Sequence, residues 1–335
     1  MSPLKHKKLK IIISALICSI VICFAVLIFV YRQFVVDQLT IWQFKPATGV
    51  VALVERAGMN DYGKFLYLAS EPQLDQASEF NTACDRIENT TSILGCYSNY
   101  KIYLYNVTDA QLDGIREVTA AHETLHVAYL RLSDNERTNV NKLLEAEYVK
   151  LENDSNFKSL MEFYDRTEPG QRDNELHSVI GTEISDISPE LELYYKKYFS
   201  DRQKVVSLDE QYSSVFEDLT AKATELATQL NSLAKTITSD IEKYNSDAST
   251  LNSDIVLFNQ RADAGTFNSM SQFYSERSVL AARITTLNTL RDSVVANKSS
   301  YNSLLIEYNS ISSQSKKLYD SIDSTLVSLP AVDLQ

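Results

Sequence analysis

Apolar residues recur every three or four positions through the last third of the chain, and this spacing limits the fold more than any other feature. One series spans residues 208–258 and a second spans 280–322. Such spacing places the apolar side chains along one seam of a long helix. The break between the two series contains Gly265, which suits a turn. We therefore predict an antiparallel coiled-coil hairpin over residues 203–328, with arms on the order of 80 Å long at 1.5 Å rise per residue.

The hairpin sequence contains many Ser and Asn residues and no grouping that is typical of catalysis. Polar residues such as Arg291 and Lys298 fall on the seam, so the coiled coil is weakly specified. We expect it to act as a spacer, to form an oligomer, or to bind a surface partner.

The composition agrees with long helices and argues against one class of partner. The 335 residues include only 8 Gly and 6 Pro, which disfavours a loop-rich all-β fold. Acidic residues outnumber basic ones by 44 to 32, giving a formal net charge of -12. We therefore expect no nucleic-acid partner, because nucleic-acid binding needs a basic surface.

An uncharged apolar run, residues 11–30, lies near the N-terminus. A helix of this length matches the hydrocarbon core of a bilayer, about 30 Å. Four lysines lie within residues 1–10, whereas Arg32 alone follows closely. The positive-inside rule then predicts a cytoplasmic basic tail over 1–10, a single-pass signal anchor over 11–30, and an extracellular remainder. The alternative is a cleaved signal peptide, but its apolar core is usually about 7–15 residues and no A-x-A-like site follows.

The segment between this run and residue 107 has mixed structure. Residues 66–68 favour a short strand, and residues 93–97 and 101–107 favour two more. The segment 101–107 alternates and is rich in aromatic and β-branched residues. A capping-box pattern at 108–111 predicts a helix that continues to about Leu132.

The four cysteines fall into two pairs. Cys18 and Cys23 lie in the apolar run, whereas Cys84 and Cys96 lie in a polar stretch. If that stretch is outside the cell, a disulfide between Cys84 and Cys96 closes a short loop. The alternative is two free thiols.

The sequence His122-Glu123-Thr124-Leu125-His126 carries the clearest chemical signal. Two histidines four residues apart lie one turn apart on a helix, so both imidazoles can reach one Zn²⁺ ion. A glutamate beside the first histidine can then act as a general base toward water activated by the metal. A helix with two unrelated surface histidines is the plainer alternative.

This H-E-x-x-H pattern, preceded by a pair of strands, resembles the zincin metallopeptidases. The resemblance implies zinc bound by His122 and His126, catalysis by Glu123, and pairing of residues 101–107 with an extended peptide substrate. The extended metzincin pattern needs a histidine ten residues after His122, where this chain has Leu132. The resemblance is therefore to the glutamate zincins (gluzincins), without placement in a specific family.

The third zinc ligand is then expected to be a downstream carboxylate. Asn174-Glu175-x-x-Ser178 resembles the Asn-Glu-x-x-Ala helix of several glutamate zincins, which implies Glu175 as the ligand. Glu183, about 80° further round the same helix, is the alternative, and Asp186 is a third candidate. His177 could stabilise the oxyanion of a tetrahedral intermediate or compete as the third ligand, although a lone histidine near a helix start is more often structural.

Together these features predict a mainly α fold. It comprises a transmembrane helix, an α+β zincin-like catalytic domain with a small sheet over residues 36–200, and the coiled-coil hairpin. The expected function is a membrane-anchored, extracellular zinc metallopeptidase that acts on a peptide or protein. One alternative is a surface interaction or scaffold protein that acts through the hairpin, with the zincin-like site inactive or structural. Another is a peptidase of peptidoglycan cross-links.

Overall fold

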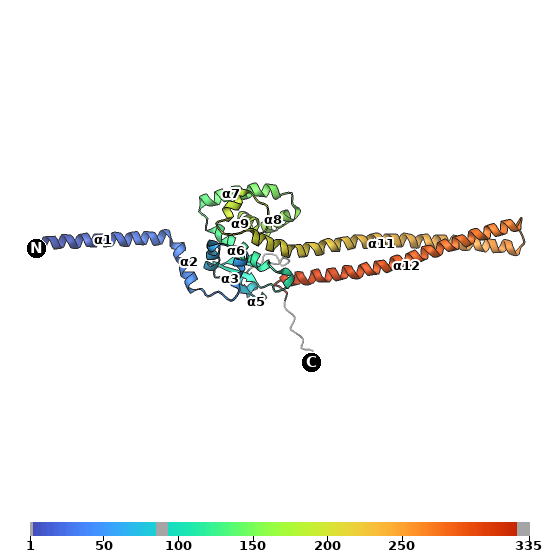
Figure 1. Ribbon diagram of the computed structural model, residues 1–335, viewed down its shortest axis with the longest axis horizontal. Coiled ribbons are helices and arrows are strands. Elements are labelled where there is room, and N and C mark those ends of the chain that lie inside the picture. Colours follow the sequence, from blue (N-terminus) through green and yellow to red (C-terminus); the bar gives the residue numbers. More distant parts are fainter. Residues whose placement is uncertain (1–2, 85–92, 327–335) are drawn as a thin grey trace, which may run out of the picture. The chain divides into compact units, whose positions relative to one another are not determined.

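The structure, a computed structural model, describes residues 3–84 and 93–326, with side chains described at residue 13 and from residue 16 onward (Figure 1). The described chain is mainly α-helical with one small sheet, as predicted. Its contacts divide it into two compact units. The first comprises residues 1–215 with 319–335, and the second comprises 216–318.

The first unit contains most of the secondary-structure elements. In chain order they are α1 (Pro3–Val30), α2 (Arg32–Gln43), α3 (Val50–Arg56), α4 (Asp61–Ala69), β1 (Gln73–Asp75), α5 (Ala77–Ala83), β2 (Gly95–Ser98), β3 (Lys101–Tyr105), the 3-10 helix η1 (Ala110–Leu112), α6 (Ile115–Leu130), α7 (Asp134–Leu151), α8 (Ser155–Thr167), α9 (Arg172–Thr182) and α10 (Pro189–Tyr195).

The sheet has three strands in the order β1-β3-β2. β3 pairs with β2 in antiparallel fashion and with β1 in parallel fashion. The two strands expected at 93–97 and 101–107 are present with shifted ends. The strand expected at residues 66–68 is wrong, because these residues lie in α4. The side chain of Asn60 accepts hydrogen bonds from the backbone N–H groups of Tyr62 and Gly63 and so starts that helix.

The core of the first unit is built around α6 and α9. Every residue from Ala120 to Tyr129 of α6 is buried, and so is every residue from Asn174 to Thr182 of α9. A helix that is buried on all sides must be covered by other elements, and α3, α4, β2 and β3 also pack on α6. Gly181 lets the two helices approach closely, since a Cβ atom there would lie 2.4 Å from Leu125 Cδ1.

Local signals explain where these helices begin. α7 begins with a capping box, in which the Ser133 hydroxyl accepts from the Glu136 backbone N–H and the Glu136 carboxylate accepts from the Ser133 backbone N–H. The capping box expected at 108–111 gives only the short η1. The long helix α6 instead begins at Ile115, after Gly114 with φ of 106°. Such a positive φ favours glycine.

The helices α1 and α2 bear on the membrane span predicted at residues 11–30. Within the described residues, no helix taken alone is long and apolar enough to cross a bilayer. Leu16–Val30 and Arg32–Gln43 meet the length and composition requirements only as a pair, with a bend of 76° between them. The span expected at 11–30 includes the side chains of residues 11, 12, 14 and 15, which lie outside those described.

Two long helices, α11 (Gln203–Asp263) and α12 (Met270–Ile322), form the second unit together with the turn that joins them. They run antiparallel there, because partners on α12 descend in number as residues on α11 ascend. The ion pairs that follow this order are Lys222–Glu307, Asp254–Arg283 and Arg261–Glu276. The first turns of α11, with Val205, Val206 and Leu208, belong to the core of the first unit. Residues 327 and 328 of the predicted hairpin lie outside the described residues.

Candidate metal centre

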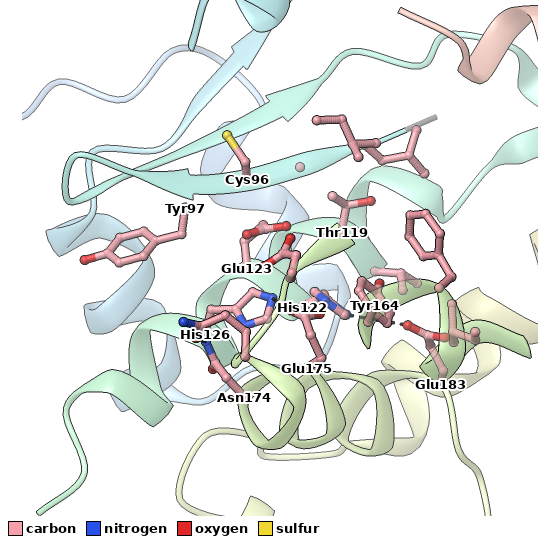
Figure 2. Close-up of a pocket in the computed structure, with 18 of the residues that line it drawn as sticks. Cys96, Tyr97, Thr119, His122, Glu123, His126, Tyr164, Asn174, Glu175 and Glu183 are labelled. Atoms are coloured by element: carbon pink, nitrogen blue, oxygen red, sulfur yellow. Dashed lines mark hydrogen bonds and ion pairs between the residues drawn. The ribbon is translucent and has the colours of Figure 1, made fainter. Parts of the chain in front are cut away.

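Three side chains with metal-binding groups meet where α6 packs against α9 (Figure 2). His122 and His126 lie one turn apart on α6, and Glu175 lies on α9. His122 Nε2 is 3.6 Å from Glu175 Oε2, and His126 Nε2 is 3.4 Å from Glu175 Oε1. Each residue offers one ligand atom, and these atoms lie within 4.8 Å of one another. The buried trio could therefore hold a metal ion.

The second nitrogen of each imidazole also has a neighbour. His122 Nδ1 lies 3.5 Å from Glu183 Oε1, and His126 Nδ1 lies 3.2 Å from the Ser178 hydroxyl. Such contacts orient an imidazole and fix which of its nitrogens faces a metal. Glu183, the alternative third ligand, thus approaches the nitrogen of His122 that faces away from Glu175. Asp186 is exposed and does not belong to the group of ligand atoms.

The pKa shifts of His122 and Glu175 show that this site favours positive charge. Burial opposes a positive charge on His122, but the neighbouring carboxylates of Glu175 and Glu183 outweigh it and raise the His122 pKa well above its usual range. Burial likewise disfavours a charged Glu175, but the positive charge of His126 and the contact with His122 lower its pKa. Glu175 Oε2 is buried without a hydrogen-bond donor among the described residues. A divalent cation would give this oxygen a partner, and two imidazoles with one carboxylate suit zinc among other metals.

Glu123 lies between the histidines and strand β2 (Figure 2). Its side chain is buried, and burial raises its pKa, although the charges of His126 and His122 oppose the rise. A Cβ atom on Gly95 of β2 would lie 2.6 Å from Glu123 Oε1. A residue with a side chain at position 95 would therefore displace this carboxylate. A raised pKa makes a carboxyl a stronger base when it is ionised, which suits a group that must accept a proton and then release it.

A cavity of about 550 Å³ opens beside these groups. Residues from β2, α6, α8, α9 and the first turns of α11 line it. Tyr164 on α8 lies with its ring stacked on that of His122, at a centroid distance of 6.3 Å. Glu168 also lines the cavity beside Glu175, and burial together with the charge of Glu175 raises its pKa to about 7.

Sequence reasoning missed Tyr164, Glu168 and Tyr212 as lining residues. Tyr212 lies near the start of α11, and burial raises its pKa well above its usual range. Each of the three is separated from the histidines by more than thirty positions in the sequence, and none lies in a recognisable motif. No sequence signal distinguishes them from the many tyrosines and glutamates elsewhere.

His177 does not line this cavity. It lies on α9 two residues after Glu175, so its side chain leaves the helix on the opposite side. It is fully buried, its Nε2 lies 2.9 Å from the Tyr194 hydroxyl, and burial lowers its pKa to about 3. A neutral histidine packed among tyrosines is a core residue here. The structure thus does not bring the expected oxyanion-stabilising His177 to the site.

The strand beside the cavity is β2, whereas the sequence led us to expect residues 101–107. β3 lies in the middle of the sheet and is paired on both sides, so its backbone has no free edge. β2 is an edge strand, and Gly95, Cys96 and Tyr97 line the cavity. The Tyr105 backbone N–H donates to the Leu94 carbonyl at 2.8 Å. By the antiparallel alternation, the backbone groups of Gly95 and Tyr97 then face away from β3.

A disulfide joins Cys84 to Cys96. Cys84 is buried at the C-terminal end of α5, and Cys96 lies in the middle of β2. The bond therefore ties the strand that lines the cavity to the helix before it. Cys18 and Cys23 are free and exposed.

Comparison with known proteins does not assign this arrangement. No protein family, curated protein or solved structure matches the chain. The chemistry of the site must therefore be judged from its residues. A buried His-His-Glu trio, a separate buried glutamate and an adjacent edge strand lie around one cavity.

Proposed function

We propose that this chain is a zinc-dependent peptidase of the H-E-x-x-H type. His122, His126 and Glu175 would hold the metal, and Glu123 would transfer protons. The observation that carries the proposal is the approach of Glu175 to both imidazoles, with Glu123 lining the same cavity. Two histidines and one glutamate form the ligand set of several zinc peptidases, which leave one position for water or substrate.

The proposed chemistry is hydrolysis of a peptide bond. A zinc ion would supply a Lewis acid that polarises the peptide carbonyl. The Glu123 carboxylate takes a proton from water as the water oxygen attacks the carbonyl carbon. It then gives that proton to the leaving nitrogen as the C–N bond breaks. Its buried position and raised pKa support both roles.

The edge strand β2 supports an extended peptide as the substrate. An extended peptide can add to an open sheet edge through main-chain hydrogen bonds. The outward-facing backbone groups of Gly95 and Tyr97 lie at the cavity wall, and Gly95 is next to Glu123. A peptide paired there would pass close to the carboxylate. The hydroxyls of Tyr164 and Tyr212 could donate hydrogen bonds to an oxygen that gains charge.

We also propose that α1 anchors the enzyme in a membrane with the catalytic unit outside the cell. The support is the uncharged run at 11–30, the lysines before it, and the disulfide, which favours an oxidising compartment. This part of the proposal is independent of the chemistry, so either can fail alone.

The first test replaces Glu123 by Gln in the full chain. We expect the variant to bind one zinc ion, as the parent does, because Glu123 is not a ligand. We expect hydrolysis of a peptide library to fall by about 10²- to 10⁴-fold, because proton transfer is lost. Zinc content by elemental analysis and cleavage by mass spectrometry give the two readouts. Glu190→Gln, on an exposed turn of α10, is the matched control.

Two results would contradict the proposal. Undiminished hydrolysis by Glu123→Gln would exclude the mechanism. Zinc binding without hydrolysis of any peptide, including peptidoglycan cross-link peptides, would favour a scaffold that acts through the α11–α12 hairpin.

A further inference from the structure

The second helix, α2, presents an apolar face that nothing in the described chain covers. At about 100° per residue, Val35, Leu39 and Trp42 fall within about 60° of one another on the helix surface. Their exposed fractions are 36%, 52% and 80%. Trp42 is the only tryptophan in the chain. Exposing such an apolar stripe to water is unfavourable.

The opposite face of α2 is fixed to the first unit. Asp37 is 3% exposed and forms a two-point ion pair with Arg131, whose Nη1 and Nη2 lie 2.5 and 3.1 Å from its carboxylate oxygens. On the flank of α2, the half-exposed Phe34 ring stacks on that of Phe65 in α4 at a centroid distance of 5.7 Å. These contacts set the rotation of α2 about its own axis. They leave Val35, Leu39 and Trp42 facing away from the unit.

The helix that precedes α2 in the chain, α1, indicates that a lipid bilayer covers this apolar face. α1 ends at Val30, and its described apolar side chains from Leu16 to Val30 are exposed. The chain then bends by 76° into α2. If α1 stands across a bilayer, a helix at this angle to it lies close to the membrane plane. Aromatic residues such as Tyr31 and Trp42 are typical of that boundary.

We propose that α2 is an interfacial membrane helix, with Val35, Leu39 and Trp42 inserted at the level of the lipid headgroups. The inference rests on the proposed anchoring by α1. It adds a second membrane contact that fixes the orientation of the catalytic unit. Arg131 directly follows α6, the helix that carries His122 and His126, and Leu130 lines the cavity. One end of the candidate active site would thus be held beside the bilayer.

Trp42 gives a direct test, because it is the sole tryptophan. The full chain is reconstituted into phosphatidylcholine vesicles whose acyl chains carry bromine either near the headgroup or near the chain end. We expect blue-shifted emission that is quenched more strongly by the bromine near the headgroup and is little affected by iodide in the water. Quenching by iodide alone would overturn the inference. Emission quenched by neither reagent would mean that protein, such as a second copy, covers the face, and would also overturn it.

A second reporter separates this inference from the anchoring proposal. In a Trp42→Phe background, Phe24→Trp places the only tryptophan on α1. We expect this reporter to be quenched most by bromine near the chain end. If Phe24→Trp behaves so and Trp42 stays in water, the anchor stands and the α2 inference fails. If Trp42 is quenched near the headgroups and the α1 reporter is not, α2 binds the surface and the anchor fails. Strongest quenching of Trp42 by the chain-end bromine would place α2 inside the span and contradict the inference.

Discussion

At the scale of single residues, Glu175 and Glu183 contact the histidines of the candidate centre in different ways, so we expect them to have different roles. Glu175 faces the Nε2 atoms of both histidines, whereas Glu183 faces only the Nδ1 atom of His122. A ligand and a residue that orients a ligand should differ when they are replaced. The first supplies a bond to the metal, and the second supplies a hydrogen bond to the imidazole.

We therefore predict different zinc affinities for two conservative variants. Glu183→Gln should weaken zinc binding by about 10- to 100-fold, because His122 loses a charged partner. Glu175→Gln should abolish stoichiometric binding, because a buried ligand is lost. Competition with a zinc-chelating dye measures both. The reverse order of affinities would identify Glu183 as the ligand.

The residues of the candidate site differ in how well the sequence alone predicts that they come together. The spacing of His122 and His126 is local, so the helix geometry alone brings the two imidazoles together. Glu175 lies about fifty positions away and reaches them only through the packing of α6 on α9. The sequence therefore predicts Glu175 as a ligand only through its resemblance to the glutamate zincins. Tyr164 and Tyr212 reach the cavity from two further helices, and no local pattern reveals that.

At the scale of elements, the α6–α9 contact determines whether the trio forms at all. Gly181 lies on α9, and a Cβ atom there would lie 2.4 Å from Leu125 Cδ1 and 2.8 Å from Tyr195 Cε1. Both neighbours are fully buried and have little room to move. The helices can therefore approach this closely only with glycine at position 181.

Gly181→Ala should separate the two helices and weaken zinc binding. Alanine favours a helix by about 1 kcal/mol over glycine, but overpacking a core costs about 1–3 kcal/mol. We expect the crowding to win, so that denaturant unfolding and dye competition both show a loss. An increase in stability with unchanged zinc affinity would mean that α6 and α9 adjust freely.

Physical reasons explain why some helices and strands could not be predicted from the sequence. β1 is three residues long and pairs in parallel with a strand almost thirty positions later, so alternation of side chains could not reveal it. Residues 66–68 are apolar enough for a strand, but the Asn60 cap draws them into α4. The long helices α11 and α12 were predictable because their apolar period repeats many times.

At the scale of the whole molecule, stability should depend on pH through Asp209 near the start of α11. Burial, with the charge of Glu183, raises the pKa of this carboxyl from 3.8 to about 7. Between these values the folded chain holds a proton that the unfolded chain has released. The free energy of unfolding must then fall as pH rises from about 4 to about 7.

Asp209→Asn should remove this contribution. We expect the variant to be more stable than the parent at pH 8 by roughly 1–3 kcal/mol, and to differ little at pH 4. Chemical denaturation of the metal-free, detergent-solubilised chain at several pH values measures the difference. An equal difference at both pH values would show that Asp209 does not titrate in this range.

The Cys84–Cys96 bond lies in a different part of the candidate site from the metal-binding trio. The metal-binding trio lies on α6 and α9, neither of which carries a cysteine, whereas the bond secures β2 beside Glu123. A chain folded under reducing conditions should therefore load zinc yet lack a firmly held substrate strand. If the chain is the proposed extracellular peptidase, oxidation would then serve as an activation step after export. Zinc content and peptide cleavage of Cys84→Ser/Cys96→Ser, measured side by side, should show the first retained and the second reduced.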